Sequence, residues 1–184
     1  SGREVGRYRR TTPAHTPWIY RGGSYWDFDW VNATSLPVFE TDLGTIGMLV
    51  CSETYPPELA RIMALKGAEL LLLPTGLATP KRHAGVVTGG DLYQTWKTLA
   101  WARAIENLAY TAVCSNLPTD ESQGLTMVCS PEQVVLDEVT AGVHLAQIDL
   151  DRVRWLREMQ DNAMEGEAIY RAKPGALRDW RRQA

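Results

Sequence analysis

The sequence predicts an α/β fold, and the prediction rests on two apolar runs and on the helical patterns that follow them. Residues 45–50 and 68–73 are short, nearly continuous apolar runs, which are typical of strands buried in a sheet. An amphipathic stretch with helix-starting residues follows each run. The order strand, strand, helix, strand, helix, followed by several strands, indicates an α/β sandwich.

The N-terminal part of the chain is expected to be irregular before a clear hairpin. Glu4–Arg10 is a candidate short strand, and Trp26–Trp30 alternates as a half-buried strand or an ordered loop would. Pro37–Thr41 and Thr45–Val50 are the two strands of the hairpin, joined by a turn at Asp42–Gly44. The return strand is nearly all apolar, so we expect it to be buried on both faces.

Two helices are expected in the middle of the chain. The first has prolines in its opening turn, and Gly67 ends it as a C-cap. Residues 76–90 are expected to form a surface loop, after which Asp91 caps a long helix that ends near Asn107.

The C-terminal part is expected to complete the sheet. Asp151 is expected to cap a closing helix, and the tail from Asn162 onward is charged and aperiodic. A polar turn is expected at Thr119–Gln123. The remaining strands are expected at 110–115, 125–129, 134–136 and 143–150, the last of which ends the sheet.

The composition and charge of the chain limit the classes of function that we expect for it. The chain has 22 acidic and 19 basic residues and a net charge of −3, which gives no reason to expect a nucleic-acid partner. No apolar run approaches the ~20 residues of a membrane span, and the polar segment Ser1–Arg10 does not resemble a signal peptide. Three widely spaced cysteines and three scattered histidines predict neither disulfides nor a metal site, so we expect a reduced, cytoplasmic protein.

Cys51 is the residue whose position suggests chemistry. It ends a predicted buried strand and comes just before a predicted helix, where unpaired N–H groups and the helix dipole favour a thiolate and can hold an oxyanion. The placement is similar to the nucleophile elbow of hydrolases. A buried structural cysteine is the alternative, and it is the favoured reading for Cys114 and Cys129, which lie inside predicted strands. No second cysteine lies near enough in sequence to favour a thiol-redox protein.

Four spaced motifs stand in a distinctive order, namely Gly47–Glu58, Ala64–Thr75, Arg103–Asn107 and Ser115–Asn116. Together they resemble the nitrilase (carbon–nitrogen hydrolase) superfamily, and the resemblance covers roughly residues 3–150. The resemblance implies an α-β-β-α sandwich and a Glu-Lys-Cys triad, in which Cys51 takes the nucleophile position. It also implies a small amide, carbamoyl or nitrile substrate, no metal or organic cofactor, and a homo-oligomer.

The sequence departs from the family pattern at two triad positions. The segment Tyr8-Arg9-Arg10-Thr11-Thr12 places Arg10 where the family has lysine. Arginine keeps the positive charge but does not shuttle protons, and a solvated surface arginine is the alternative. The general-base glutamate of the family lies well upstream of the lysine, and only nine residues precede Arg10. We therefore expect the N-terminal portion of the domain to be missing from this chain and to lie on another segment or polypeptide.

Two in-chain groups are candidate substitutes for that base, namely Glu53 and His15. Glu53 has an alternative role, which is to orient Cys51 or to pair with a basic residue such as Arg103. An aromatic cluster beside Arg10 is expected either to line an apolar pocket or to pack on the sheet. Its members are Trp18, Tyr20, Tyr25 and Trp26.

The sequence therefore predicts residues 1–161 to be the C-terminal part of one carbon–nitrogen hydrolase domain, and residues 162–184 to be an intersubunit tail. The predicted function is hydrolysis of nonpeptide C–N bonds through an acyl-enzyme on cysteine. A non-catalytic scaffold with the same fold is the alternative, favoured by Arg10. The predicted catalytic residues are Cys51, Arg10 and Glu53, and the predicted substrate-binding residues are Ser52, Thr54, Tyr55, Thr75 and Asn116.

Overall fold

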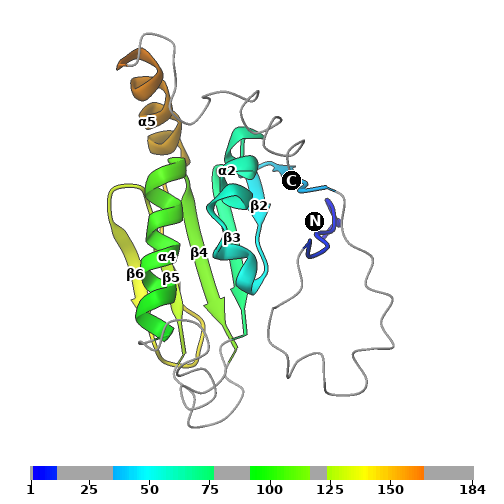
Figure 1. Ribbon diagram of the computed structural model, residues 1–184, viewed down its shortest axis with the longest axis vertical. Helices are drawn as coiled ribbons and strands as arrows, with labels where there is room; N and C mark the ends of the chain where they lie inside the picture. The colour runs from blue at the N-terminus through cyan, green and yellow to red at the C-terminus, as the bar shows by residue number, and fades with distance from the viewer. Residues whose placement is uncertain (1, 12–34, 77–91, 117–123, 164–184) are drawn as a thin grey trace.

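A computed structural model describes residues 2–11, 35–76, 92–116 and 124–163, with side chains described up to residue 159. These ranges form a six-stranded mixed sheet with helices (Figure 1). The strands are β1 (Phe39–Thr41), β2 (Gly44–Met48), β3 (Leu70–Thr75), β4 (Tyr110–Ser115), β5 (Thr126–Cys129) and β6 (Val134–Glu138). The helices are the 3₁₀ turn η1 (Cys51–Thr54) and the α-helices α2 (Pro57–Leu65), α4 (Leu92–Asn107) and α5 (Leu150–Ala163).

The strand order follows the sequence, and the three central strands run parallel. β1 pairs antiparallel with β2, and β5 and β6 add two antiparallel strands beyond β4. Helix α2 connects β2 to β3, and α4 connects β3 to β4. The carboxyl ends of β2, β3 and β4 therefore share one edge of the sheet, which is where ligands bind in open α/β sheets. The predicted α/β fold class is confirmed.

The core lies between the sheet and the two helices that cover one of its faces (Figure 1). Leu71, Leu73 and Val113 point into it, and Trp96 and Ala100 of α4 pack against them, all at most 2% exposed. The residues between them in β3 and β4 belong to the opposite face, which is only partly covered in the described ranges. The prediction that the return strand, β2, is buried on both faces is therefore wrong, because α2 and α4 cover the same face of the sheet.

Helix α2 packs very closely on β2 at Gly47. A Cβ added at Gly47 would lie 2.8 Å from both Met63 Sδ and Leu71 Cδ2. The helix ends as the sequence predicts, with Gly67 at φ +99° directly after the C-cap Lys66. Gly47 therefore sets how closely α2 approaches the sheet, and Gly67 ends α2 shortly before β3 begins.

Strand 110–115 has the predicted bounds, and the hairpin and both predicted helices of the middle region are confirmed within one or two residues. Two predicted strands are wrong. Glu4–Arg10 forms no strand, because side-chain contacts rather than a backbone ladder hold it. The predicted strand 143–150 does not form either, because residues 143–149 pair with no strand in the described ranges, Leu150 begins α5, and Val143 and Leu145 are 91% and 89% exposed. Trp26–Trp30, Asp91 with the loop before it, and Thr119–Gln123 lie outside the described residues.

Helix α5 is capped by Asp149 rather than by the predicted Asp151. Asp149 Oδ1 accepts a hydrogen bond from the backbone N–H of Arg152 at 3.1 Å, as an N-cap side chain does. Asp151 lies inside the first turn, where it pairs with Arg154 at 2.5 Å. Asp149 and Asp151 are two residues apart, so the observed helix begins two residues earlier than the predicted one.

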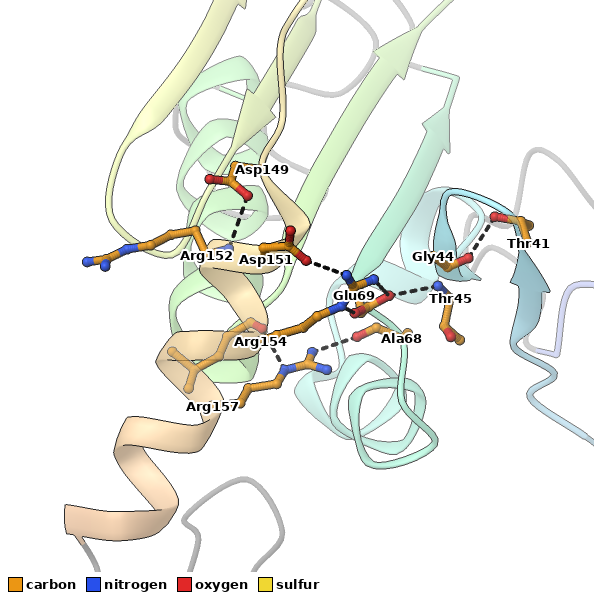
Figure 2. A network of polar contacts seen from close by, with 11 residues as sticks. Thr41, Gly44, Thr45, Ala68, Glu69, Asp149, Asp151, Arg152, Arg154 and Arg157 are labelled. Carbon is orange, nitrogen blue, oxygen red and sulfur yellow. Dashed lines mark hydrogen bonds and ion pairs between the residues drawn. The ribbon is translucent and has the colours of Figure 1, made fainter.

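Two arginines fasten α5 to the amino-terminal edge of the sheet, opposite the carboxyl ends of the parallel strands (Figure 2). Arg154 Nε donates to Glu69 Oε1 at 2.5 Å, and Glu69 Oε2 also accepts the N–H of Thr45 at 2.9 Å. Arg157 donates to the carbonyls of Ala68 at 2.6 Å and Leu108 at 2.9 Å. The helix therefore supplies hydrogen-bond donors to the chain segments just before β3 and β4.

None of the helices in the described ranges combines the length and apolarity that a bilayer span requires.

Glu69 makes the stability of this edge dependent on pH. Burial raises the pKa of Glu69, but hydrogen bonds from Arg154 and Thr45 outweigh it, so the pKa lies below its usual value. A depressed pKa in the folded state contributes stability above the unfolded pKa of about 4.3, and that stability is lost as the pH falls through the folded pKa. We expect Glu69→Gln to lower the free energy of unfolding by about 1 kcal/mol at pH 7.

Denaturant unfolding at pH 7 and pH 3 measures this effect. The difference between the wild type and Glu69→Gln should shrink at pH 3, whereas Glu40→Gln, which changes an exposed carboxylate on β1, should cost little at either pH. A difference that stays constant between the two pH values would contradict the assigned role of Glu69.

Candidate active site

Cys51 occupies a strained turn at the carboxyl end of β2. The strand ends at Met48, Leu49 is fully buried, and Cys51 begins η1 with φ +55°. This left-handed conformation costs a residue with a Cβ about 1–2 kcal/mol. The predicted sharp turn after the strand is confirmed, but the predicted helix does not begin directly after Cys51. Cys51 is the first residue of a single 3₁₀ turn, and α2 begins six residues later at Pro57.

Glu53 is the third residue of η1 and is fully buried, and within the described ranges its carboxylate accepts four hydrogen bonds. Oε2 accepts the N–H of Val50, the residue before Cys51, and the hydroxyl of Tyr8, both at 2.8 Å. Oε1 accepts the backbone N–H and the hydroxyl of Thr11, both at 2.6 Å. The bond from Val50 is one half of a capping box. Glu53 therefore joins the Cys51 turn to a segment 42 residues away.

Arg10 lies at the same turn. Its Nη2 donates to the hydroxyl of Ser52, the neighbour of Cys51, and its Nε is buried without an acceptor in the part of the chain that the structure describes. The side chain is half-buried, so Arg10 is not a freely solvated surface arginine. A fixed positive charge is thus placed beside the candidate nucleophile.

Arg103 of α4 holds the other end of η1. It is 5% exposed and donates from Nε to the carbonyl of Thr54 at 3.0 Å and from Nη2 to the carbonyl of Tyr55 at 2.6 Å. Nη1 pairs with Glu106 at 2.9 Å. Arg103 therefore satisfies the last carbonyls of η1, which would otherwise be buried without donors. These bonds differ from the pairing with Glu53 that the sequence suggests for Arg103.

Tyr55 adds a phenol next to Cys51. Burial raises the pKa of Tyr55, and the charge of a Cys51 thiolate raises it further, so the phenol is a proton-bearing donor at neutral pH. Its ring meets Trp96 edge-on, with centroids 5.7 Å apart and planes at 77°. The site side of the core is therefore aromatic and firmly packed.

Thr75 and Asn116 lie at the carboxyl ends of the two strands beyond β2, where the backbone N–H of Asn116 donates to the carbonyl of Thr75 at 3.2 Å. The Thr75 hydroxyl is buried, and so is that of Thr54; neither has a partner within the described ranges. The structure thus brings Cys51, Glu53, Arg10, Ser52 and Tyr55 together, with Thr75 and Asn116 on adjacent strand ends.

Some of the site was not predicted from the sequence, and some lies outside the described residues. Tyr8 and Thr11 were missed as partners of Glu53, although they stand beside Arg10 in the sequence. His15 and the aromatic cluster Trp18, Tyr20, Tyr25 and Trp26 lie outside the described residues. In the ranges that the structure covers, no three His, Cys, Asp or Glu side chains gather as a metal site requires.

The model of the carbon-nitrogen hydrolase family matches residues 1–158. The chain belongs to this family. A probable nitrilase of Schizosaccharomyces pombe is 33% identical over 131 residues, which are 68% of this chain and 44% of that protein. The deaminated glutathione amidase of Synechocystis is 28% identical, covering 86% of this chain and 57% of the enzyme. The chain spans about half the length of these curated relatives.

Solved structures of the family have the same fold as this chain. A carbon–nitrogen hydrolase from Helicobacter pylori matches with a TM-score of 0.59 and 25% identity, over 70% of this chain and 48% of the other. An amidase variant from Nesterenkonia sp. AN1, solved with acrylamide added at its active-site cysteine, matches with a TM-score of 0.53 and 25% identity, over 73% of this chain and 51% of the other. The resemblance inferred from the motifs is therefore confirmed.

The positive φ of Cys51 predicts an unusual order of stability among variants. Cys51→Gly should be about 1 kcal/mol more stable than Cys51→Ala, because both lose the thiol and only glycine relieves the left-handed strain. At Ser52, whose φ is not positive, the same pair of substitutions should show the opposite order. Denaturant unfolding of the four variants measures both differences. A Cys51→Gly variant no more stable than Cys51→Ala would show that the turn is not strained.

Proposed function

We propose that the protein is an amidase-type hydrolase that cleaves nonpeptide C–N bonds through a thioester on Cys51. The observation that supports this most strongly is the strained turn that presents Cys51 at the carboxyl edge of the parallel strands, beside the guanidinium of Arg10. Strain of this kind is maintained where the surrounding structure imposes it, commonly at active sites. Membership of a hydrolase family is consistent with such a site.

For an amide substrate the proposed chemistry has two stages. The Cys51 sulfur attacks the carbonyl carbon, the oxygen takes the negative charge, and the C–N bond then breaks as nitrogen leaves with a proton, giving a thioester and ammonia or an amine. Water next attacks the thioester carbon, and the C–S bond breaks to release the carboxylic acid and the thiol. For a primary amide, one water is consumed and one ammonia is released.

Arg10 is proposed to stabilise the oxyanion in both stages. Its charge is fixed, and its buried Nε has no acceptor in the described ranges, so a donor is available at the turn. Ser52 orients the guanidinium, and Tyr55 offers a second proton-bearing donor near the sulfur. Thr75 and Asn116 are proposed to bind substrate from the adjacent strand ends, whereas the complete burial of Thr54 favours support of the turn.

Glu53 is not proposed as the general base. Its carboxylate oxygens already accept four hydrogen bonds in a fully buried position, so taking a proton there would disrupt the turn. We therefore propose that a group other than Glu53 accepts the proton during the reaction. The competing proposal is a scaffold with impaired catalysis, which Arg10 in the family's lysine position favours.

Turnover decides between the enzyme and the scaffold. We expect the full-length protein to release ammonia or amine from one member of a panel of small amides, carbamoyl compounds and nitriles, with deaminated glutathione and N-carbamoylputrescine included because relatives are named for them. Cys51→Ala should lower the rate by about 10³-fold or more. Mass spectrometry of the wild type should find the acyl group on the Cys51 peptide.

The matched control is Cys114→Ala, because Cys114 is an exposed cysteine of β4. This variant should keep the wild-type rate. Absence of turnover on the whole panel would support the scaffold, whereas turnover that survives Cys51→Ala would contradict the role of Cys51 as the nucleophile.

A further inference from the structure

We propose that Glu53 is a positioning residue, which holds Arg10 against the Cys51 turn through Tyr8 and Thr11 and thereby sets the rate of Cys51 acylation. This inference rests on the proposed function, because acylation is the step that it concerns. It assigns to Tyr8 and Thr11 a part in the reaction although neither contacts the reacting atoms. We call the three residues the Glu53 tether.

Two residues of the Glu53 tether, Tyr8 and Thr11, flank Arg10 in the sequence. Tyr8 stands two residues before Arg10 and Thr11 stands immediately after it, and both donate to the same buried carboxylate. Tyr8, Arg10 and Thr11 are half-buried, whereas the side chains between and before them, Arg9 and Arg7, are exposed. Tyr8, Arg10 and Thr11 are therefore the side chains of this segment that face the Cys51 turn, and Tyr8 and Thr11 are bonded there to Glu53.

Little else in the described ranges fixes this segment. Residues 2–11 form no strand or helix there, and the ion pair between Arg7 and Glu4 joins two exposed side chains of the segment itself. Its other contacts include the ring of Tyr8, which packs against the core, the bond from Arg10 to Ser52, and Gly6, where an added Cβ would lie 2.3 Å from the Phe39 ring. Gly6 is four residues from Arg10. The hydrogen bonds of Tyr8 and Thr11 to Glu53 restrain the backbone on both sides of Arg10, so the Glu53 tether limits where the guanidinium can lie.

The two carboxylate oxygens of Glu53 connect different parts of the site. Oε1 binds only Thr11 among these partners, whereas Oε2 binds both Tyr8 and the N–H of Val50, next to Cys51. The four groups that contact these oxygens within the described ranges are all donors, so a carboxylate satisfies them and an amide does not. Glu53→Gln would turn an NH₂ group toward two donors. Burial, together with the hydrogen bond and charge of Glu53, raises the pKa of Tyr8, so its phenol keeps the proton that it donates.

The geometry has a consequence for the rate. A guanidinium that stabilises an oxyanion contributes only when its donors stand where the charge develops, and a displacement of about 1 Å can cost about 100-fold. Loss of one bond of the tether leaves Arg10 charged but less well placed. The tether should therefore affect acylation only while Arg10 is present.

A double-mutant cycle between Tyr8 and Arg10 tests this dependence. The single-turnover rate of Cys51 acylation is measured with the substrate found in the turnover panel for the wild type, Tyr8→Phe, Arg10→Ala and the double variant. We expect Tyr8→Phe to slow acylation about tenfold with Arg10 present, which corresponds to about 1.4 kcal/mol, and less than twofold with Ala at position 10. Glu53→Gln should behave in the same way with a larger effect.

Tyr110→Phe is the matched control. The Tyr110 hydroxyl is also a buried hydrogen-bond partner, since it accepts the N–H of Asp149, but it lies at the edge of the sheet that α5 covers. This variant should acylate at the wild-type rate even if it is less stable. Hydrogen exchange of the peptide containing residues 8–11 should accelerate in Tyr8→Phe and remain unchanged in Tyr110→Phe.

The outcomes separate the two proposals. If the wild type acylates and Tyr8→Phe slows it equally with Arg and with Ala at position 10, the positioning role is wrong while the proposed function stands. Unchanged hydrogen exchange in Tyr8→Phe would also overturn the tether. Absence of acylation in the wild type would overturn the proposed function, and the positioning role with it.

Discussion

The buried carboxylate of Glu53 is the constraint on which the candidate site depends. A carboxylate removed from water is costly unless it is paired or hydrogen-bonded, and Glu53 has no exposed surface. Four donors from two distant segments meet that cost. The segment carrying Arg10 and the turn carrying Cys51 are therefore held together by the requirement to satisfy one side chain.

Arginine side chains stabilise both edges of the sheet in the same way. At the carboxyl edge, Arg103 donates to the carbonyls of Thr54 and Tyr55, where η1 ends. At the amino edge, Arg157 donates to carbonyls just before β3 and β4. In both places a planar guanidinium reaches from a helix to backbone acceptors that have no ladder partner. These arginines stabilise chain ends that the sheet itself leaves unsatisfied, and they keep the strained Cys51 turn on a rigid frame.

The local pattern of the sequence predicts the central strands, the two helices and the Cys51 turn, because continuous apolar runs and capping residues act over a few positions. It fails at residues 143–149, where alternation indicates a strand but the segment pairs with no strand in the described ranges and leaves Val143 and Leu145 exposed. The roles of Tyr8 and Thr11 were also not predictable, since their bonds to Glu53 span more than 40 residues and leave no periodic signal. Family motifs pointed to Arg10, but only the geometry places it beside Ser52.

A crystal structure of the protein after reaction with acrylamide tests the central claim most directly, namely that the Glu53 tether and the Cys51 turn form one site. We predict an adduct on the Cys51 sulfur, with Arg10 still held at the turn and a guanidinium nitrogen about 3 Å from the carbonyl oxygen of the adduct. The bonds from Tyr8 and Thr11 to Glu53 should remain closed. An adduct on Cys114 alone, or an adduct on Cys51 with Arg10 turned into solvent, would contradict the account.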